Sequence, residues 1–158
     1  MATPHRYELG LRWTGNRGVG TRTFRAFTRD HDVTAAGVPT LLGSADPAFR
    51  GDPSRWNPEQ LLVASLAQCH LLTYLWLAVQ ERVVVLAYED TPTGTMLAEP
   101  GGSGRFAEVT LHPAVTIADG ADVERAEALH GRVGDYCFIA RSVNFPVHHD
   151  PTTLVTPR

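Results

Sequence analysis

The sequence predicts an α+β fold, in which strands and helices follow one another in blocks instead of alternating regularly. The first block contains segments of alternating polar and apolar residues, which is typical of strands, and one long apolar helix follows it. Residues 61–79 of that helix are apolar on nearly all sides, which indicates a buried central helix. The length of 158 residues fits a single domain over residues 1–158.

The block before the helix begins with a predicted hairpin. Residues 7–13 alternate and are predicted as its first strand, and residues 21–28, where Arg alternates with Phe or Ala, as its second. The turn between them contains Gly18 and Gly20, which permit a positive φ. Two shorter strands are expected at residues 32–34 and 40–42.

The central helix has a clear predicted start after a long polar loop over residues 43–57. Asn57 is a favourable N-cap, and Pro58 suits the first helical position. Glu59 complements the positive end of the helix dipole. We expect the helix to end near Gln80.

The segment after the helix is predicted as a second hairpin. Residues 82–90 are rich in β-branched side chains and should form a strand. Residues 91–104 contain several glycines and prolines and are predicted as the hairpin loop. Residues 105–117 alternate and should form the partner strand, with an edge or a bulge at Pro113.

The last part of the chain is predicted to hold a second helix and a final strand. Asp119 or Asp122 could cap a helix over residues 123–133. Residues 143–147 are predicted as the last strand, and the tail from His148 onwards is expected to be solvated rather than to bind a metal.

The composition excludes several classes of function. The chain has 14 basic residues, all arginine, against 17 acidic ones, so bulk charge does not predict nucleic-acid binding. The absence of lysine excludes a phosphate-binding P-loop and a Schiff base. The first residues lack the apolar core of a signal peptide, and polar residues interrupt the apolar run, so we expect a cytoplasmic protein without membrane insertion.

The two cysteines, Cys69 and Cys137, are too few for a disulfide scaffold or a four-cysteine zinc site. One interpretation is that both are inert core residues. The other is a redox pair of one reactive and one resolving thiol. A reactive thiol needs a nearby cation, which in this chain must be arginine or histidine.

Three sequence motifs resemble those of the OsmC/Ohr family, the osmotically inducible and organic hydroperoxide resistance proteins. They are NPEQLLVASLAQCH at residues 57–70, CFIARSVN at residues 137–144 and WTGNRGVG at residues 13–20. Their order and spacing also match. The resemblance implies an OsmC-like fold, with antiparallel sheets packed on a long buried central helix, and an intertwined homodimer.

The resemblance also implies a thiol-dependent peroxidase that reduces organic hydroperoxides without a metal or an organic cofactor. Cys69 would be the peroxidatic cysteine and Cys137 the resolving one. Arg17 would hold the thiolate and Glu59 would hold Arg17. A dithiol, such as a dihydrolipoyl protein, would be the reductant. The alternative function is an OsmC-fold small-molecule binding or redox-sensing protein with little turnover.

Helix geometry places a constraint on these roles. Glu59 and Cys69 are separated by about 15 Å along a straight helix, so one Arg17 cannot contact both from the same helix. Either the helix start bends back, or Glu59 reaches Cys69 of a partner chain, which predicts a homodimer with composite sites. Arg50 or Arg55 in the preceding loop could also replace Arg17 as the thiolate partner.

Overall fold

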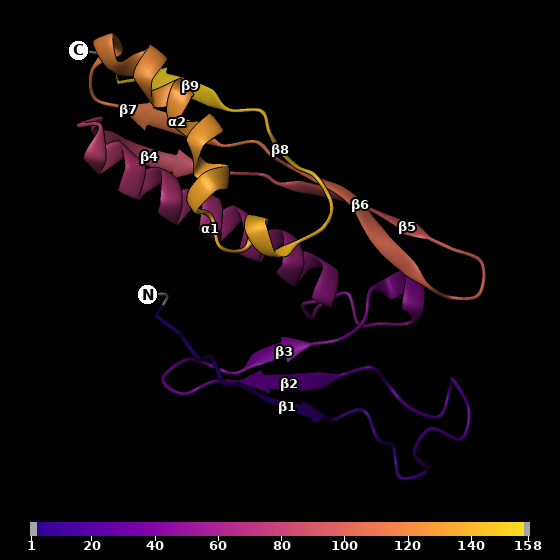
Figure 1. The fold of residues 1–158 in the computed structure, drawn as a ribbon. Helices are drawn as coiled ribbons and strands as arrows, with labels where there is room; N and C mark the ends of the chain where they lie inside the picture. Colours follow the sequence, from indigo (N-terminus) through magenta and orange to yellow (C-terminus); the bar gives the residue numbers. More distant parts are fainter. Residues whose placement is uncertain (1–2, 157–158) are drawn as a thin grey trace. The chain divides into compact units, whose positions relative to one another are not determined.

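The computed structural model describes residues 3–156, so the two residues at each end of the predicted 1–158 domain lie outside the described residues. The chain forms two compact units. The first ends at Leu62 and the second begins at Val63. Figure 1 shows the elements of both units.

The first unit contains a three-stranded antiparallel sheet in the order β1-β2-β3. Its strands are β1 (Gly10–Trp13), β2 (His31–Thr34) and β3 (Leu41–Gly43). Three predicted strands are therefore confirmed, the first in shorter form. A short 3-10 helix, η1 (Pro47–Phe49), interrupts the predicted loop.

The predicted strand at residues 21–28 is wrong, since the structure has turns there. The Asn16 side chain accepts hydrogen bonds from the backbone N–H groups of Gly18 and Gly20, at 2.9 and 3.1 Å. Both glycines have positive φ, so the backbone coils instead of extending. A single bridge between Asn16 and Phe27 is all that remains of the expected pairing in the residues described.

The long helix α1 (Pro58–Gln80) confirms the predicted central helix. Its start is a capping box, in which Asn57 Oδ1 accepts the N–H of Gln60 at 2.8 Å. The Gln60 side chain returns the contact by accepting the N–H of Asn57 at 3.2 Å. By length and composition alone α1 could cross a membrane, a test that core helices of soluble proteins also pass.

The second unit contains two further three-stranded sheets, in the orders β4-β7-β9 and β5-β6-β8. Their strands are β4 (Val85–Glu89), β5 (Thr93–Ala98), β6 (Gly104–Leu111), β7 (Ala114–Ile117), β8 (Val147–His149) and β9 (Thr152–Val155). The pairs β4–β7 and β5–β6 are antiparallel, whereas β6–β8 and β7–β9 are parallel. The α+β class is confirmed, and the sheets are mixed.

The predicted second hairpin is confirmed in part, because β4 pairs antiparallel with β7, the last part of the predicted partner strand. Residues 91–104 are not one loop, because they contain β5, which pairs with β6. Residues 105–117 are not one strand, because β6 ends before Pro113 and β7 begins after it. Proline lacks a backbone N–H, so it interrupts a hydrogen-bonded ladder.

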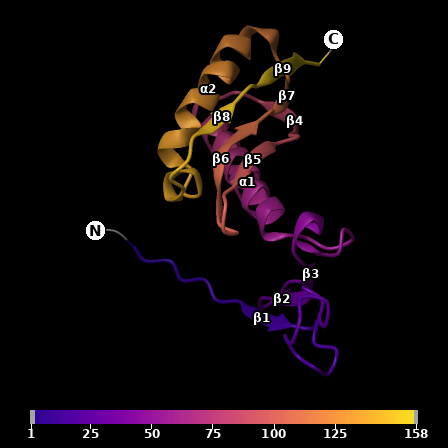
Figure 2. The same ribbon diagram turned by 90° about the vertical axis from the view of Figure 1, so that its right-hand side faces the viewer.

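The C-terminal segment also differs from the prediction. The second helix is confirmed as α2 (Val123–Tyr136), preceded by η2 (Gly120–Asp122) and followed by η3 (Ala140–Ser142). The tail is not solvated throughout, since β8 and β9 continue the two sheets. Figure 2 shows β9 returning beside α2 and β7. The strands β8 and β9 pair in parallel with strands far away in the sequence, so no local sequence pattern predicts their pairing.

The main core of the second unit joins both helices to β7. Its central side chains are each at most 1% exposed: Tyr74 and Leu77 of α1, Val115 and Ile117 of β7, and Leu129 of α2. The Tyr74 hydroxyl donates to a backbone carbonyl of α2. This packing sets the middle of α1 against α2, which positions the residues described next.

Candidate functional site

The structure brings the two cysteines together at the junction of α1 and α2. Cys69 lies on α1 and is half-buried, whereas Cys137 is the C-cap of α2 and is 2% exposed. Cys69 is close enough to Cys137 to raise the pKa of its thiol, and both belong to the same packed cluster. Both are free thiols. Because the two thiols are neighbours, they are candidates to form a disulfide.

The surroundings of Cys137 favour its protonated form. Burial is the main cause that raises the pKa of its thiol, and the hydrogen bond with Cys69 raises it further. The backbone N–H of Ala140, 3.4 Å from its Sγ, acts weakly in the opposite direction. A protonated Cys137 has an S–H that can act as a donor.

A cavity of about 660 Å³ lies against Cys69. Its apolar walls are formed by side chains of α1 and of the segment after α2, namely Leu72, Trp76, Phe138 and Ile139. This volume and lining are typical of small-molecule sites. Among the aromatic side chains nearby, Phe138 lines this cavity, while Phe145 stacks on Phe106 against the core.

Arg141 is a candidate that the sequence analysis did not single out. It lies in η3 and is the only arginine lining the Cys69 cavity among the residues described. Its guanidinium donates to the backbone carbonyl of Asp135 at 3.1 Å, which fixes it at the rim. The sequence feature that could have identified Arg141 is its position four residues after Cys137, within the second cysteine motif.

The model of the OsmC-like protein family matches residues 51–151, which include both cysteines and the whole of α1 and α2. The chain belongs to the OsmC-like family. No curated protein matches the sequence significantly.

Solved structures of OsmC-like proteins share the fold over nearly the whole chain. An OsmC-like protein of unknown function from Vibrio cholerae is 25% identical, with a TM-score of 0.83 over 94% of this chain and 99% of that one. An organic hydroperoxide resistance protein OsmC from Legionella pneumophila, described as a predicted redox protein, is 18% identical, with a TM-score of 0.68 over 97% and 99% of the two chains. An organic hydroperoxide resistance protein from Elizabethkingia anophelis is 17% identical, with a TM-score of 0.68 over 98% and 100%.

The other two predicted site residues of this OsmC-like protein, Arg17 and Glu59, belong to the first unit. Arg17 is exposed in the turn after β1, and it forms no ion pair with Glu59 within the part of the chain that is described. One carboxylate oxygen of Glu59 is buried without a hydrogen-bond partner.

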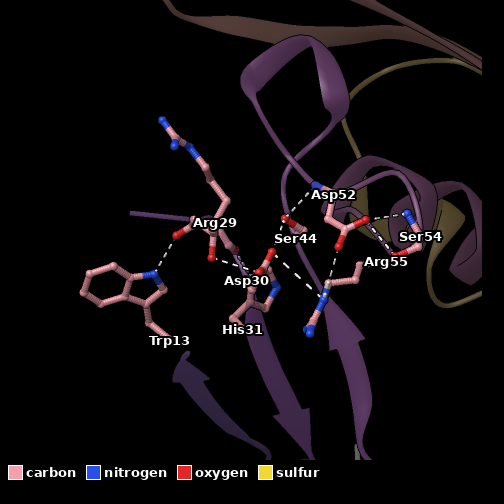
Figure 3. A network of polar contacts seen from close by, with 9 residues as sticks. Trp13, Arg29, Asp30, His31, Ser44, Asp52, Ser54 and Arg55 are labelled. Carbon is pink, nitrogen blue, oxygen red and sulfur yellow. Dashed lines mark hydrogen bonds and ion pairs between the residues drawn. The ribbon is translucent and has the colours of Figure 1, made fainter. Parts of the chain in front are cut away.

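Arg55, in the loop before α1, lies between two carboxylates (Figure 3). Its Nε lies 4.0 Å from Asp30 Oδ1 and 3.8 Å from Asp52 Oδ2. Asp30 in turn accepts the hydroxyls of Thr28 and Ser44, at 2.8 and 3.0 Å. One terminal nitrogen of Arg55 is buried without a partner. Arg55 therefore remains the alternative to Arg17 that the sequence raised.

A cluster of buried histidines lies near the cysteine pair. His70 Nε2 and His130 Nδ1 are 2.9 Å apart, and Tyr74 stacks on His130 at 4.3 Å between ring centroids. His149 is exposed, as expected for the tail, and its ring centroid lies 5.9 Å from that of His70. Burial lowers the pKa of His70 to about 4 and that of His130 to about 3, with smaller contributions from the neighbouring imidazoles.

Lowering the pH from about 6.5 to about 5 should reduce the free energy of unfolding, because the unfolded chain binds protons that the folded His70 and His130 do not. Each histidine kept neutral contributes a slope of about 1.4 kcal/mol per pH unit. This stability is complete above the unfolded pKa and is lost as the pH falls toward the lowered values.

Urea unfolding at a series of pH values measures that slope. A His130→Phe variant keeps a ring against Tyr74 and should reduce the slope by about half. The slopes are compared, not the stabilities, because the variant also removes a hydrogen bond from His70. An unchanged slope would contradict the assignment.

Proposed function

We propose that this OsmC-like protein is a thiol-dependent peroxidase that reduces organic hydroperoxides to alcohols. The observation that carries the proposal is the packing of Cys69 beside Cys137, of which Cys69 lines a largely apolar cavity. A half-buried thiol facing a cavity, with a second thiol behind it, is the arrangement that two-cysteine peroxide chemistry requires.

The proposed reaction has two steps. The Cys69 thiolate attacks the distal peroxide oxygen, the O–O bond breaks, and the leaving alkoxide takes a proton to become the alcohol. Cys69 is then a sulfenic acid. The Cys137 sulfur attacks it, water leaves, and a Cys69–Cys137 disulfide forms. The two electrons that reduce the hydroperoxide thus come from the two thiols.

The cavity supports organic hydroperoxides as the substrate class. Leu72, Trp76 and Phe138 offer apolar surface to an alkyl or aryl group, and burial of that surface favours binding. Hydrogen peroxide has no such group and gains nothing from these walls. A dithiol, such as a dihydrolipoyl protein, would return the disulfide to two thiols.

Arg17 and Glu59 complete the proposed site. A guanidinium stays protonated and can bond a thiolate and a carboxylate at the same time. Because Glu59 and Cys69 are about 15 Å apart along one helix, we assign Arg17 and Glu59 to a homodimer with composite sites, in which they meet Cys69 of the partner. Large apolar side chains left exposed by the single chain support a covering partner: Tyr7, Leu9, Leu11, Leu72, Val79 and Phe138.

Addition of one equivalent of an organic hydroperoxide, such as cumene hydroperoxide, should remove both thiols. Thiol titration before and after addition, with mass spectrometry, should show one intramolecular disulfide and one equivalent of alcohol. Hydrogen peroxide at the same concentration is the control and should react more slowly. Oxidation of Cys69 alone would favour a redox sensor, and no reaction would favour a binding protein.

A further inference from the structure

A second cavity, of about 250 Å³, reaches the other cysteine. Cys137 lines it and Cys69 does not, whereas Cys69 lines the larger cavity and Cys137 does not. Each cysteine of the pair therefore lines a cavity that the other does not line. The smaller cavity has no part in the proposed reduction of the hydroperoxide.

The geometry of thiol–disulfide exchange gives this second opening a use. An attacking thiolate approaches one sulfur of a disulfide in line with the bond, from the side away from the leaving sulfur. After oxidation, Cys137 is bonded to Cys69, so its free side faces away from Cys69. The smaller cavity is the space that reaches Cys137 without passing Cys69.

The leaving groups favour the same direction of attack. Attack on Cys69 would expel Cys137, and burial raises the pKa of that thiol, which makes it a poor leaving group. Attack on Cys137 expels Cys69 instead, into contact with the larger cavity. The site is then ready for the next hydroperoxide.

The lining of the smaller cavity suits a slender polar thiol. Imidazoles of His70, His148 and His149 line it, together with aliphatic side chains. Gly131 and Gly134 of α2 also line it, and a Cβ added at either would meet no atom within 4 Å. These two glycines keep the opening wide, although glycine weakens a helix by about 1 kcal/mol relative to alanine.

We propose that the dithiol reductant enters through the cavity of His70, His148 and His149 and attacks the sulfur of Cys137. This inference rests on the proposed disulfide chemistry. The reductant thiolate forms a mixed disulfide with Cys137, and the Cys69–Cys137 bond breaks with release of a Cys69 thiolate. The second reductant thiol then attacks the first reductant sulfur and releases Cys137. The reductant leaves as its disulfide, having supplied two electrons.

The test begins from protein oxidised with diamide, which forms the disulfide without any hydroperoxide. Reduction by excess dithiothreitol is followed by quenched thiol titration. Gly134→Leu and Gly131→Leu place a side chain across the smaller cavity and should slow reduction by about tenfold or more. Gly134→Ala, which leaves the opening nearly free, and Thr73→Trp, which fills the larger cavity, should stay within about twofold of the unmodified protein.

A second measurement identifies the attacked sulfur. Oxidised protein is treated with 2-mercaptoethanol, which cannot complete the second step, and the freed thiol is trapped with N-ethylmaleimide. Peptide mass mapping should find mercaptoethanol on Cys137 and maleimide on Cys69. The reverse labelling, or slowing by Thr73→Trp but by neither leucine variant, would overturn the inferred route.

The two proposals fail separately. If hydroperoxide leaves both thiols intact while the diamide-formed disulfide shows the expected rates and labelling, the peroxidase proposal is wrong and the reductant route stands. If hydroperoxide forms the disulfide but the leucine variants do not slow its reduction, the peroxidase proposal stands and the reductant route is wrong. Thermal unfolding of each variant shows that the helix is retained, because leucine has a higher helix propensity than glycine.

Discussion

A Cys69→Ser variant should consume no organic hydroperoxide. A serine hydroxyl is not ionised near neutral pH and is a poor nucleophile, so the rate of the first turnover should fall by roughly a thousandfold or more. The substitution is nearly isosteric at a half-buried position on α1, so the fold should be retained. Stopped-flow measurement of hydroperoxide loss checks the rate, and thermal unfolding checks the fold. Turnover at an unchanged rate would refute the role of Cys69.

The same variant can test the composite site. If Arg17 acts on Cys69 of the partner chain, Arg17→Ala alone should also be inactive. Co-expression of the Cys69→Ser and Arg17→Ala chains should nevertheless restore about a quarter of the activity, because half of the dimers are mixed and each mixed dimer holds one intact site of two. No recovery would place Arg17 and Cys69 in the same chain. Arg22→Ala, at an exposed arginine of the same turn segment, is the matched control, and Arg55→Ala and Arg141→Ala test the other two candidate arginines.

A Cys137→Ser variant should perform one turnover and then stop. The first attack needs only Cys69, so one equivalent of hydroperoxide should still be consumed. Without Cys137 the sulfenic acid has no partner for a disulfide, and excess hydroperoxide carries it to the sulfinic acid, which is irreversible by ordinary thiols. Mass spectrometry should show the addition of one oxygen atom and then of a second, with dithiothreitol-dependent turnover lost.

The unmodified protein is the control, and it should resist over-oxidation under the same conditions. Sustained turnover of Cys137→Ser would mean that another thiol resolves the sulfenic acid, such as the reductant itself. That result would remove Cys137 from the cycle and leave the buried thiol as a core residue. It would leave the role of Cys69 untouched.

Local signals predicted the features that depend on neighbours in sequence. The start of α1 could be predicted because Asn57 and Pro58 act within one helical turn. The pairing of β6 with β5 depends on which strands meet in space, whereas the break at Pro113 has a local cause and was expected. The strand β5 was hidden because its residues, 93–98, include a glycine and lie in a stretch rich in glycine and proline.

The site shows the same division. Cys69 and Cys137 could be chosen from the sequence because cysteine is rare in this chain. The approach of His149 to His70 could not, because it depends on a parallel strand that joins its sheet from far along the chain. Arg141 was within a quoted motif, but only the packing of η3 beside α1 shows that it faces the cavity of Cys69.

The position of the two cysteines links the redox state of the protein to its free energy of unfolding. A bond between the middle of α1 and the end of α2 closes a covalent ring around every element from β4 to α2. Closing a ring of that size removes freedom from the unfolded chain and is worth roughly 4 kcal/mol. Oxidation to the disulfide would therefore raise the free energy of unfolding, and reduction at the end of each cycle would lower it again.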